Sequence, residues 1–240
     1  MFIEPMLLQS VHEAFDDDRY IFEPKIDGHR LILSRIDGKV RLYTRHKTDC
    51  TNQYPELHNV PAPEGADLIL DGEIAVFNQD GTNDFEAVMS RFKGAKGPVV
   101  NFVVFDILHF DGRDLRKMPL VERKEILASV LTPNPYFTLT ASIDGRGIDF
   151  YDLIKQRNME GIVAKKKDSS YVGRRSHSWL KIVNYQYHNV RIAGWRKGEF
   201  GWLIHIEDGS GSLKPAGILE LAVPPLMKKS FFNVAKSIAI

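Results

Sequence analysis

The feature that most limits the fold of this chain is its repeated interruption by Asp-Gly dipeptides. Five of them divide the first 112 residues into short apolar runs. Asp-Gly favours tight turns in which both residues adopt positive φ, so the flanking runs are expected to pair as antiparallel strands. The clearest case joins residues 30–36 to residues 39–43 through Asp37-Gly38. This pattern predicts a β-hairpin with a type I′ turn.

Hydrophobic periodicity adds further strands and a few short helices. Strands are expected over residues 68–77, 99–110 and 160–165, the first of them broken at Asp71-Gly72. Short helices are expected over residues 85–92, 120–131 and 149–158. The strands and helices do not alternate regularly as in a βαβ array. The sequence therefore predicts an α+β domain built on antiparallel sheet.

The character of the sequence changes near residue 189. Short apolar runs over residues 190–200, 202–206 and 218–223 are separated by Gly-rich turns and follow a linker at residues 185–189. Such spacing is typical of a small all-β module. We therefore expect two domains, residues 1–188 and residues 189–240. About fifty residues are few for a five-stranded barrel, so the second domain is expected to be incomplete.

Composition excludes several classes of protein. No apolar run approaches the ~20 residues that span a bilayer, and residues 1–10 lack the basic and apolar regions of a signal peptide. A single cysteine, Cys50, permits neither an internal disulfide nor a cysteine-based zinc site and suits a reducing cytoplasm. The formal net charge is +1, but residues 155–197 carry eleven bases and two acids. That segment is suited either to tracking a polyanion or to forming a solvated basic face.

The strongest candidate for chemistry is Lys25 in the octapeptide Glu-Pro-Lys-Ile-Asp-Gly-His-Arg. Pro24 restricts the backbone before it, and Asp27-Gly28 turns the chain directly after it. A lysine held in this way can act as a nucleophile if neighbouring cations or burial lower its pKa. A lysine beside a turn is usually a solvated surface residue, so the turn alone favours that interpretation.

Further segments give this lysine a context. Each segment can also be explained without any chemical role, as a bulge, a core aromatic residue or a run of solvated lysines. They are Leu-Asp-Gly-Glu-Ile at 70–74, Val-Phe-Asp-Ile-Leu at 104–108, Glu-Gly-Ile-Val-Ala-Lys at 160–165 and Ser-Trp-Leu-Lys-Ile at 178–182.

Taken in order, these segments resemble the covalent nucleotidyltransferases, the superfamily of DNA ligases, RNA ligases and mRNA capping enzymes. The matching motifs are Lys25 to Arg30, Thr44-Arg45, Asp71-Gly72-Glu73, Phe105-Asp106, Glu160 to Lys165 and Trp179-Leu180-Lys181. Chance agreement on all six in this order is improbable. The sequence is most similar to small ATP-dependent DNA ligases of bacteria and phages and to the ligase domain of bacterial end-joining proteins.

The resemblance implies a fold and a reaction. The fold would be an antiparallel-sheet, ATP-grasp-like nucleotidyltransferase domain followed by an OB-fold β-barrel. Lys25 would attack the α-phosphorus of ATP, carry AMP, and pass it to the 5′-phosphate of a nick, where the 3′-hydroxyl displaces it. Cations near Lys25 would lower its pKa. The cofactors would be ATP and Mg²⁺ or Mn²⁺, and the partner of a cytoplasmic monomer, with no membrane association, would be nicked duplex DNA.

The resemblance also assigns roles to single residues. Glu23, Ile26 and Phe105 would contact the adenosine, and Arg30, Arg45 and Glu73 the ribose, the phosphates or the 5′-phosphate of the nick. Glu73 and Glu160 would hold the metal, and Lys165 and Lys181 would neutralise the α-phosphate. The basic segment supplies the expected DNA contacts, which are Lys166, Lys167, Arg174, Arg175, Arg191, Arg196 and Lys197, together with Trp195.

The sequence departs from the family in two places. Val183 stands where the fifth motif has its second lysine, which removes one expected phosphate contact. No Arg-x-Asp-Lys motif follows, so we expect weak self-adenylation and better sealing of pre-adenylated DNA. Two alternatives remain open: an RNA ligase or GTP-using capping enzyme, and a non-catalytic DNA-binding protein that retains the fold.

Overall fold

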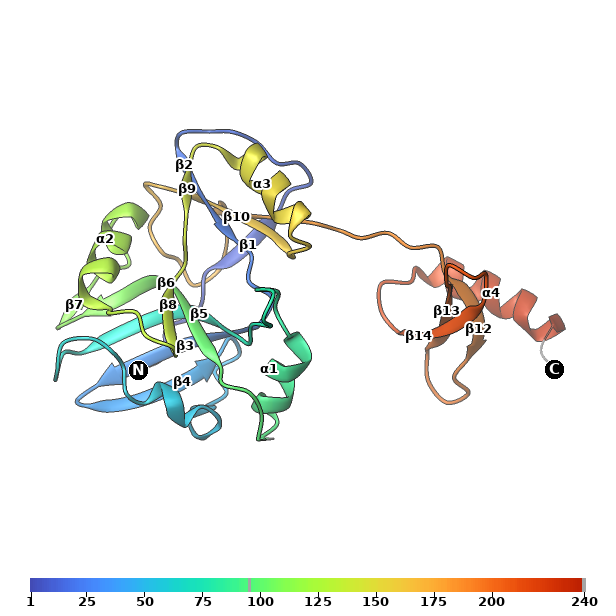
Figure 1. Ribbon diagram of the computed structural model, residues 1–240, viewed down its shortest axis with the longest axis horizontal. Helices are drawn as coiled ribbons and strands as arrows, with labels where there is room; N and C mark the ends of the chain where they lie inside the picture. The colour runs from blue at the N-terminus through green and yellow to red at the C-terminus, as the bar shows by residue number, and fades with distance from the viewer. Residues whose placement is uncertain (95, 239–240) are drawn as a thin grey trace. The chain divides into compact units, whose positions relative to one another are not determined.

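The predicted hairpin forms one edge of the larger sheet in the computed structural model, which describes residues 1–94 and 96–238. Strands β3 (His29–Ile36) and β4 (Lys39–Thr44) pair antiparallel, with Ile36 opposite Lys39. Asp37 and Gly38 have φ values of 49° and 69°, as a type I′ turn requires. The chain as a whole divides into two units, Met1–Tyr185 and Gln186–Ile240, each of which is described by itself (Figure 1).

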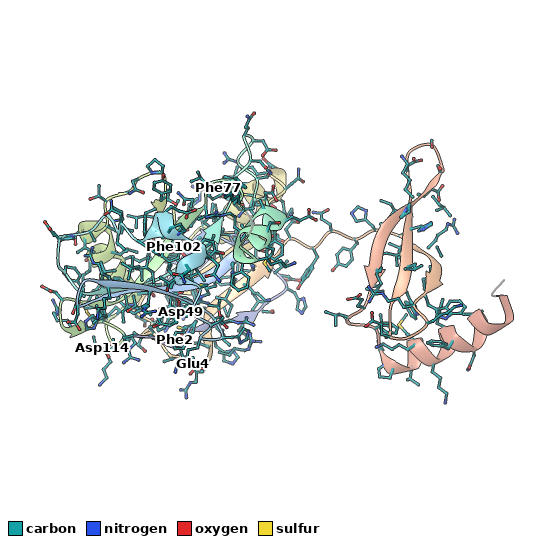
Figure 2. The ribbon with its side chains drawn as sticks, turned by 90° about the horizontal axis from the view of Figure 1, so that it is seen from below. Phe2, Glu4, Asp49, Phe77, Phe102 and Asp114 are labelled. Carbon is teal, nitrogen blue, oxygen red and sulfur yellow. The ribbon has the colours of Figure 1, made fainter. Side chains whose placement is uncertain are left out.

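The larger sheet of the first unit has six strands. Its order is β4-β3-β5-β6-β7, with β5 at Leu68–Ala75, β6 at Asn101–Phe110, β7 at Arg113–Asp114 and β8 (Phe137–Leu139) paired to β6. The expected break at Asp71-Gly72 is absent, because β5 continues through it with a shift of register. Gly72 is needed for close packing instead: a Cβ there would lie 2.6 Å from the ring of Phe102. Phe102 is a buried side chain and is labelled in Figure 2.

The second sheet of this unit has five strands. Its order is β1 (Leu7–Ser10), β11 (Arg175–Val183), β10 (Gly161–Lys166), β2 (Tyr20–Pro24) and β9 (Ile143–Asp144). The predicted antiparallel pairing accounts for most of both sheets, but the sheets are mixed, because β1 pairs parallel to β11 and β6 pairs parallel to β8. Both parallel partners are short strands added at the margin of an antiparallel sheet, and their pairing depends on tertiary contacts rather than on adjacent turns.

Three helices of the first unit lie at the sheet surfaces (Figure 1). They are α1 (Phe85–Phe92), α2 (Leu120–Val130) and α3 (Gly147–Gln156), close to the three predicted ranges. The carboxylate of Asp84 caps α1 by accepting from the backbone N–H of Ala87 at 2.9 Å. No helix among the described residues is long and apolar enough to cross a membrane.

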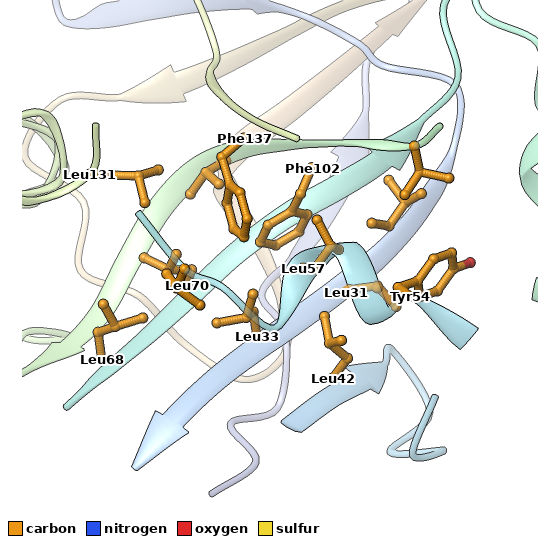
Figure 3. Close-up of a cluster of buried hydrophobic side chains, with 14 of the residues drawn as sticks. Leu31, Leu33, Leu42, Tyr54, Leu57, Leu68, Leu70, Phe102, Leu131 and Phe137 are labelled. Atoms are coloured by element: carbon orange, nitrogen blue, oxygen red, sulfur yellow. The ribbon is translucent and has the colours of Figure 1, made fainter. Parts of the chain in front are cut away.

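The main core lies against one face of the six-stranded sheet. Two short 3₁₀ segments, Thr51–Gln53 and Pro55–Leu57, place Tyr54 and Leu57 on Leu31, Leu33 and Leu42 (Figure 3). Phe102 and Phe137 belong to the same cluster and meet edge to face with ring centroids 6.0 Å apart. A second buried cluster, which contains Tyr171 and Trp179, joins residues of both sheets. The two sheets are therefore fixed to each other where the site lies.

The second unit contains a three-stranded antiparallel sheet and one helix. Its strands are β12 (Arg191–Trp195), β13 (Trp202–Glu207) and β14 (Leu213–Leu219), and its helix is α4 (Pro225–Ile238). The all-β prediction was wrong for this unit. Phe231 of α4 packs against Trp202 at 4.6 Å and Trp195 at 6.0 Å, so the apolar run at the C-terminus covers the sheet as a helix. Over residues 186–238 the strands close no barrel.

Candidate active site

Lys25 lies immediately after β2, and its backbone is fixed by β10. Its amide donates to the carbonyl of Gly161 at 2.8 Å. Its Nζ lies 2.5 Å from Oε1 of Glu160, and both side chains are largely buried. Glu160 is itself held by the next strand, because the amide of Asn184 donates to its carbonyl at 2.8 Å. The lysine singled out from the sequence is therefore positioned beside a carboxylate and is not a solvated surface lysine.

A cavity opens beside Lys25 between the two sheets. The residues that line it include seven of the predicted catalytic and nucleotide contacts: Glu23, Lys25, Ile26, Arg30, Glu73, Phe105 and Lys165. Leu8, Pro24, Thr140, Val163 and Trp179 complete the lining. Residues from motifs as far apart in the chain as Lys25 and Trp179 thus converge on one cavity, with aromatic rings at the Phe105 end and charged groups at the Lys25 end.

The end of this cavity at Phe105 also holds a buried ion pair. Nζ of Lys165 lies 2.6 Å from Oε2 of Glu23, and it also lies 4.1 Å from the ring centroid of Phe105 and 4.2 Å from that of Trp179. Burial lowers the pKa of Lys165, and the charge of Glu23 opposes this shift. Lys165 was expected at the α-phosphate. In this structure its ammonium group contacts Glu23 and the two aromatic rings.

Lys124, which no sequence motif indicated, also binds Glu23. Its Nζ lies 2.5 Å from Oε1 of Glu23. Lys124 is on α2, far from every motif in the sequence, and a lysine in a helix with helical charge spacing gives no signal of such a contact. Only the tertiary packing of α2 brings the two together.

Arg30 is held by a buried carboxylate that sequence analysis did not assign to the site. Its guanidinium donates to both oxygens of Asp71, at 3.0 and 2.6 Å, and stacks 5.3 Å from the Phe105 centroid. Burial disfavours its charge, but Asp71 outweighs this effect and raises the pKa of Arg30. The hydroxyl of Tyr171 donates to Oδ2 of Asp71 at 2.6 Å and accepts from the amide of Met6 at 3.0 Å. Asp71 and Tyr171 therefore fix the arginine that lines the cavity.

Two carboxylates near Lys25 fit a divalent cation. Burial raises the pKa of Glu73 to about 8, and Arg30 and Lys25 counteract it. Oε2 of Glu160 is buried without a hydrogen-bond partner in the described part of the chain. Among the residues that the structure describes, no three or more His, Cys, Asp or Glu side chains are grouped so that they could hold a metal ion by themselves. A donor set of one or two carboxylates is what Mg²⁺ takes when phosphate oxygens and water supply its other ligands.

Lys181 lies outside the cavity lining but on the correct face of the smaller sheet. In the register, Val163 lies opposite both Glu23 and Lys181. Directly opposed residues point to the same side, so Lys181 shares a row with two cavity residues. Val183 lies opposite Gly161. No lysine therefore occupies that position of the register, as the sequence indicated.

Arg45 lines a second cleft, which adjoins the first through Arg30 and Glu73. The other residues of this cleft are Gly28, His29, Thr44, His46, Thr48 and Phe92. A guanidinium nitrogen of Arg45 lies 3.3 Å from a ring nitrogen of His46. Arg45 is thus placed beside the cavity rather than inside it.

The seven predicted DNA contacts differ in their partners. Lys166, Lys167, Arg191 and Arg196 each pair with a carboxylate, and Arg175 donates to the carbonyl of Leu8. Arg174 and Lys197 are exposed, and neither forms an ion pair with another described residue. Four of the seven lie in the first unit and three in the second. Trp195 also lies in the second unit, where its ring packs on Phe231 and Phe232.

Comparison with known proteins points to one family. A family model described as ATP dependent DNA ligase domain matches residues 5–182. The SPbeta prophage-derived DNA ligase-like protein LigB of Bacillus subtilis is 40% identical over 240 residues, which cover 99% of this chain and 86% of that protein. The multifunctional non-homologous end joining protein LigD of Mycobacterium bovis is 34% identical over 186 residues, 76% of this chain but only 24% of that protein.

Solved structures give the same result. The structure described as mycobacterial DNA ligase D complexed with ATP and MES superposes with a TM-score of 0.69 at 30% identity. The match covers 98% of this chain and 77% of that one. A Lig E DNA ligase shares the fold at 18% identity, with a TM-score of 0.65.

Proposed function

Because this chain belongs to the ATP-dependent DNA ligase family, we propose that Lys25 is the residue that carries AMP between ATP and a DNA nick. The observation that supports this most is the placement of the Lys25 amine at the charged end of a cavity that also contains Arg30, Glu73, Phe105 and Lys165. Phosphoryl-type transfer depends on positioning and charge neutralisation, and this arrangement supplies both.

The first step forms a bond between Nζ of Lys25 and the α-phosphorus of ATP and breaks the bond to pyrophosphate. Lys25 must lose its proton to react. Oε1 of Glu160, 2.5 Å from the amine, is placed to accept it. A 5′-phosphate oxygen of the nick then attacks the same phosphorus and releases Lys25. Finally the 3′-hydroxyl attacks the 5′-phosphorus and releases AMP.

The end of the cavity at Phe105 is suited to the base of the nucleotide. Phe105 offers an aromatic face, and Glu23 offers carboxylate oxygens that accept hydrogen bonds from an exocyclic amino group. Arg30, fixed by Asp71, is held ready for the ribose and phosphates. Lys181 and Lys165 would neutralise the charge of the α-phosphate. Val183 would contribute no charge there.

Glu73 and Glu160 would hold Mg²⁺ or Mn²⁺. When bound, the metal neutralises phosphate charge that the protein's own cations leave uncompensated. Ionised Glu73 is required for this role, and the burial that raises its pKa therefore favours a cation beside it.

The substrate is nicked duplex DNA, bound through its phosphates. We assign this contact to the basic residues of both units, with Arg45 at the 5′-phosphate of the nick beside the cavity. We further propose that the second unit corresponds to part of an OB-fold and that the protein acts as a monomer in the cytoplasm, where buried Cys50 remains a free thiol.

A nick-sealing assay tests the proposal. The protein is incubated with ATP, Mg²⁺ and a duplex that carries one 5′-phosphorylated nick, and the covalent protein–AMP adduct is measured separately. We expect sealing and an adduct with the wild type and neither with Lys25→Ala. Lys117→Ala, which changes an exposed lysine, serves as the matched control. An adduct on folded Lys25→Ala would refute the assignment.

A further inference from the structure

The carboxylate of Glu23 has two cationic partners, and only one of them lines the cavity. Lys165 reaches Oε2 from inside, and Lys124 reaches Oε1 from α2. Lys124 is not among the cavity-lining residues. Whatever Lys124 does for a bound nucleotide, it therefore does through Glu23.

Helix α2 is built to hold Lys124 in place. The preceding residue, Arg123, is fully buried and donates to both oxygens of Asp106 at 2.8 Å. It also donates to the carbonyls of Met118 at 2.6 Å and Ser169 at 2.9 Å. Since adjacent residues of a helix share its backbone, this anchor fixes where the Lys124 side chain begins. Asp106 directly follows Phe105 in the chain. Helix α2 therefore supports Phe105 through Arg123 and Asp106, and Glu23 through Lys124.

The Glu23 side chain is 3% exposed, and so is that of Lys165, whereas Lys124 is 18% exposed. A buried carboxylate without a cation tends to take up a proton. Lys165 has a second duty at the phosphate in the proposed reaction, and Lys124 has no other ion-pair partner among residues 1–94 and 96–238. Lys124 is therefore the cation that can remain with Glu23 when Lys165 contacts the phosphate.

The charge of Glu23 decides which base it can bind. An ionised carboxylate only accepts hydrogen bonds, whereas a protonated one also donates. An acceptor suits a purine with an amino group at C6 and opposes a purine with a carbonyl there. A protonated carboxyl would accommodate either.

We propose that Lys124 is a positioning residue for base selection, which holds the Glu23 carboxylate in place as a hydrogen-bond acceptor so that the cavity takes a 6-amino purine and rejects a 6-oxo purine. This inference rests on the proposed function, in which Lys25 accepts the nucleotide. The charged groups around the Glu23 carboxylate are Lys124 from α2, Lys165 from β10, Lys181 in the same row of β11, Asp106 from β6, Arg30 from β3, and Lys25 and Glu73 in the shared cavity.

The test compares ATP with inosine triphosphate, which differs only at the 6-position and the adjacent ring nitrogen. The measurement is kcat/KM for covalent nucleotide transfer to Lys25, between about pH 6 and about pH 8. We expect the wild type to prefer ATP about ten- to a hundredfold, as suits a hydrogen bond to a charged group, with little change over this range. Lys124→Met should lose about tenfold of this preference, and lose more of it at the lower pH.

Three further variants separate base selection from structural support. Lys124→Arg should restore the preference because it keeps the cation. Lys124→Gln keeps a donor without charge and replaces the methionine variant if that one fails to fold. Lys117→Met changes an exposed lysine just outside α2 and should behave as the wild type.

The outcomes are distinct. A folded Lys124→Met or Lys124→Gln with the wild-type ratio of ATP to inosine triphosphate at every pH would overturn the inference and leave the proposed function intact. An equal loss with both nucleotides would also overturn it, because that result indicates structural support alone. Absence of a covalent nucleotide on the wild type with ATP would instead refute the proposed function, and this inference with it.

Discussion

Fully buried ion pairs occur among the described residues of the first unit, whereas the ion pairs described in the second unit are all partly exposed. In the first unit, Arg123 and Asp106 form an ion pair with both side chains fully buried, at 2.8 Å. In the second unit, Arg191 and Glu207 lie 3.7 Å apart with 70% and 56% of their side chains exposed. Burial removes solvent screening, so the first kind of pair fixes geometry, and the second kind remains exchangeable with ions in solution.

This difference matches two tasks within one reaction. In the proposed function, the cavity beside Lys25 needs groups whose positions are set before the substrate arrives, and Arg30–Asp71 and Lys165–Glu23 would provide them. Binding of a DNA backbone needs cations that can leave a weak partner for a phosphate. The comparison therefore predicts large effects where buried pairs are broken and small, salt-dependent effects on the surface.

The largest effect is expected from Arg123→Met. It leaves Asp106 buried without its cation and should lower the free energy of unfolding by about 3–5 kcal/mol. Arg191→Met in the second unit should change it by less than about 1 kcal/mol. Chemical denaturation of both variants measures the contrast. The double variant Arg123→Met/Asp106→Leu should recover much of the loss, and equal losses in the two single variants would invalidate the comparison.

The next effect concerns the pH dependence of stability. Burial raises the pKa of Glu73 from its ordinary 4.5 to about 8. Between these values the folded protein keeps a proton that the unfolded chain has lost, so stability falls as pH rises through this window. Glu73→Gln removes this contribution. The Tm of the wild type should therefore fall more steeply than that of Glu73→Gln as the pH is raised.

Glu64→Gln changes an exposed carboxylate and is the control for the Glu73 experiment. Its Tm profile should follow the wild type. Parallel Tm profiles for the wild type and Glu73→Gln would show that Glu73 is ionised in the free protein and would remove the argument from burial.

A smaller effect is expected from Tyr171→Phe. The variant removes the hydroxyl that donates to Asp71 at 2.6 Å and accepts from Met6. The buried amide of Met6 then loses its acceptor and Asp71 keeps only Arg30 as a donor, which should reduce the free energy of unfolding by about 1–3 kcal/mol. It should also raise the KM for ATP, because Asp71 holds Arg30. Tyr136→Phe, at an exposed tyrosine, is the control, and an unchanged KM would separate Tyr171 from the site.

Local patterns predicted what depends on local chemistry. The Asp37-Gly38 hairpin and the helix over residues 85–92 formed as expected because their turn and cap lie within the segment. The cavity was anticipated because its residues belong to recognisable motifs. The contacts of Lys124 and Tyr171 were not, because they join residues about one hundred positions apart and leave no trace in spacing. The helix α4 was also missed, since its apolar residues were compatible with either period.

The smallest effects concern DNA affinity and sharpen the comparison on the surface itself. Arg174 and Lys197 lack a carboxylate partner among the described residues, whereas Lys167 pairs with Asp144 at 2.8 Å and Arg191 with Glu207. A free cation that binds a phosphate releases about one counterion, so Arg174→Ala and Lys197→Ala should each lower the slope of log affinity against log salt by about 0.9.

Lys167→Ala and Arg191→Ala are the matched variants, one in each unit. Each removes a cation but frees a carboxylate, and their slopes should change less. Fluorescence anisotropy with a nicked duplex over a range of salt concentrations measures all four. If Lys167→Ala and Arg191→Ala reduce the slope as much as Arg174→Ala and Lys197→Ala, the ion pairs open fully on DNA. The exposed ion pairs would then not limit how their cations bind DNA, whereas the buried ion pairs fix the positions of their side chains.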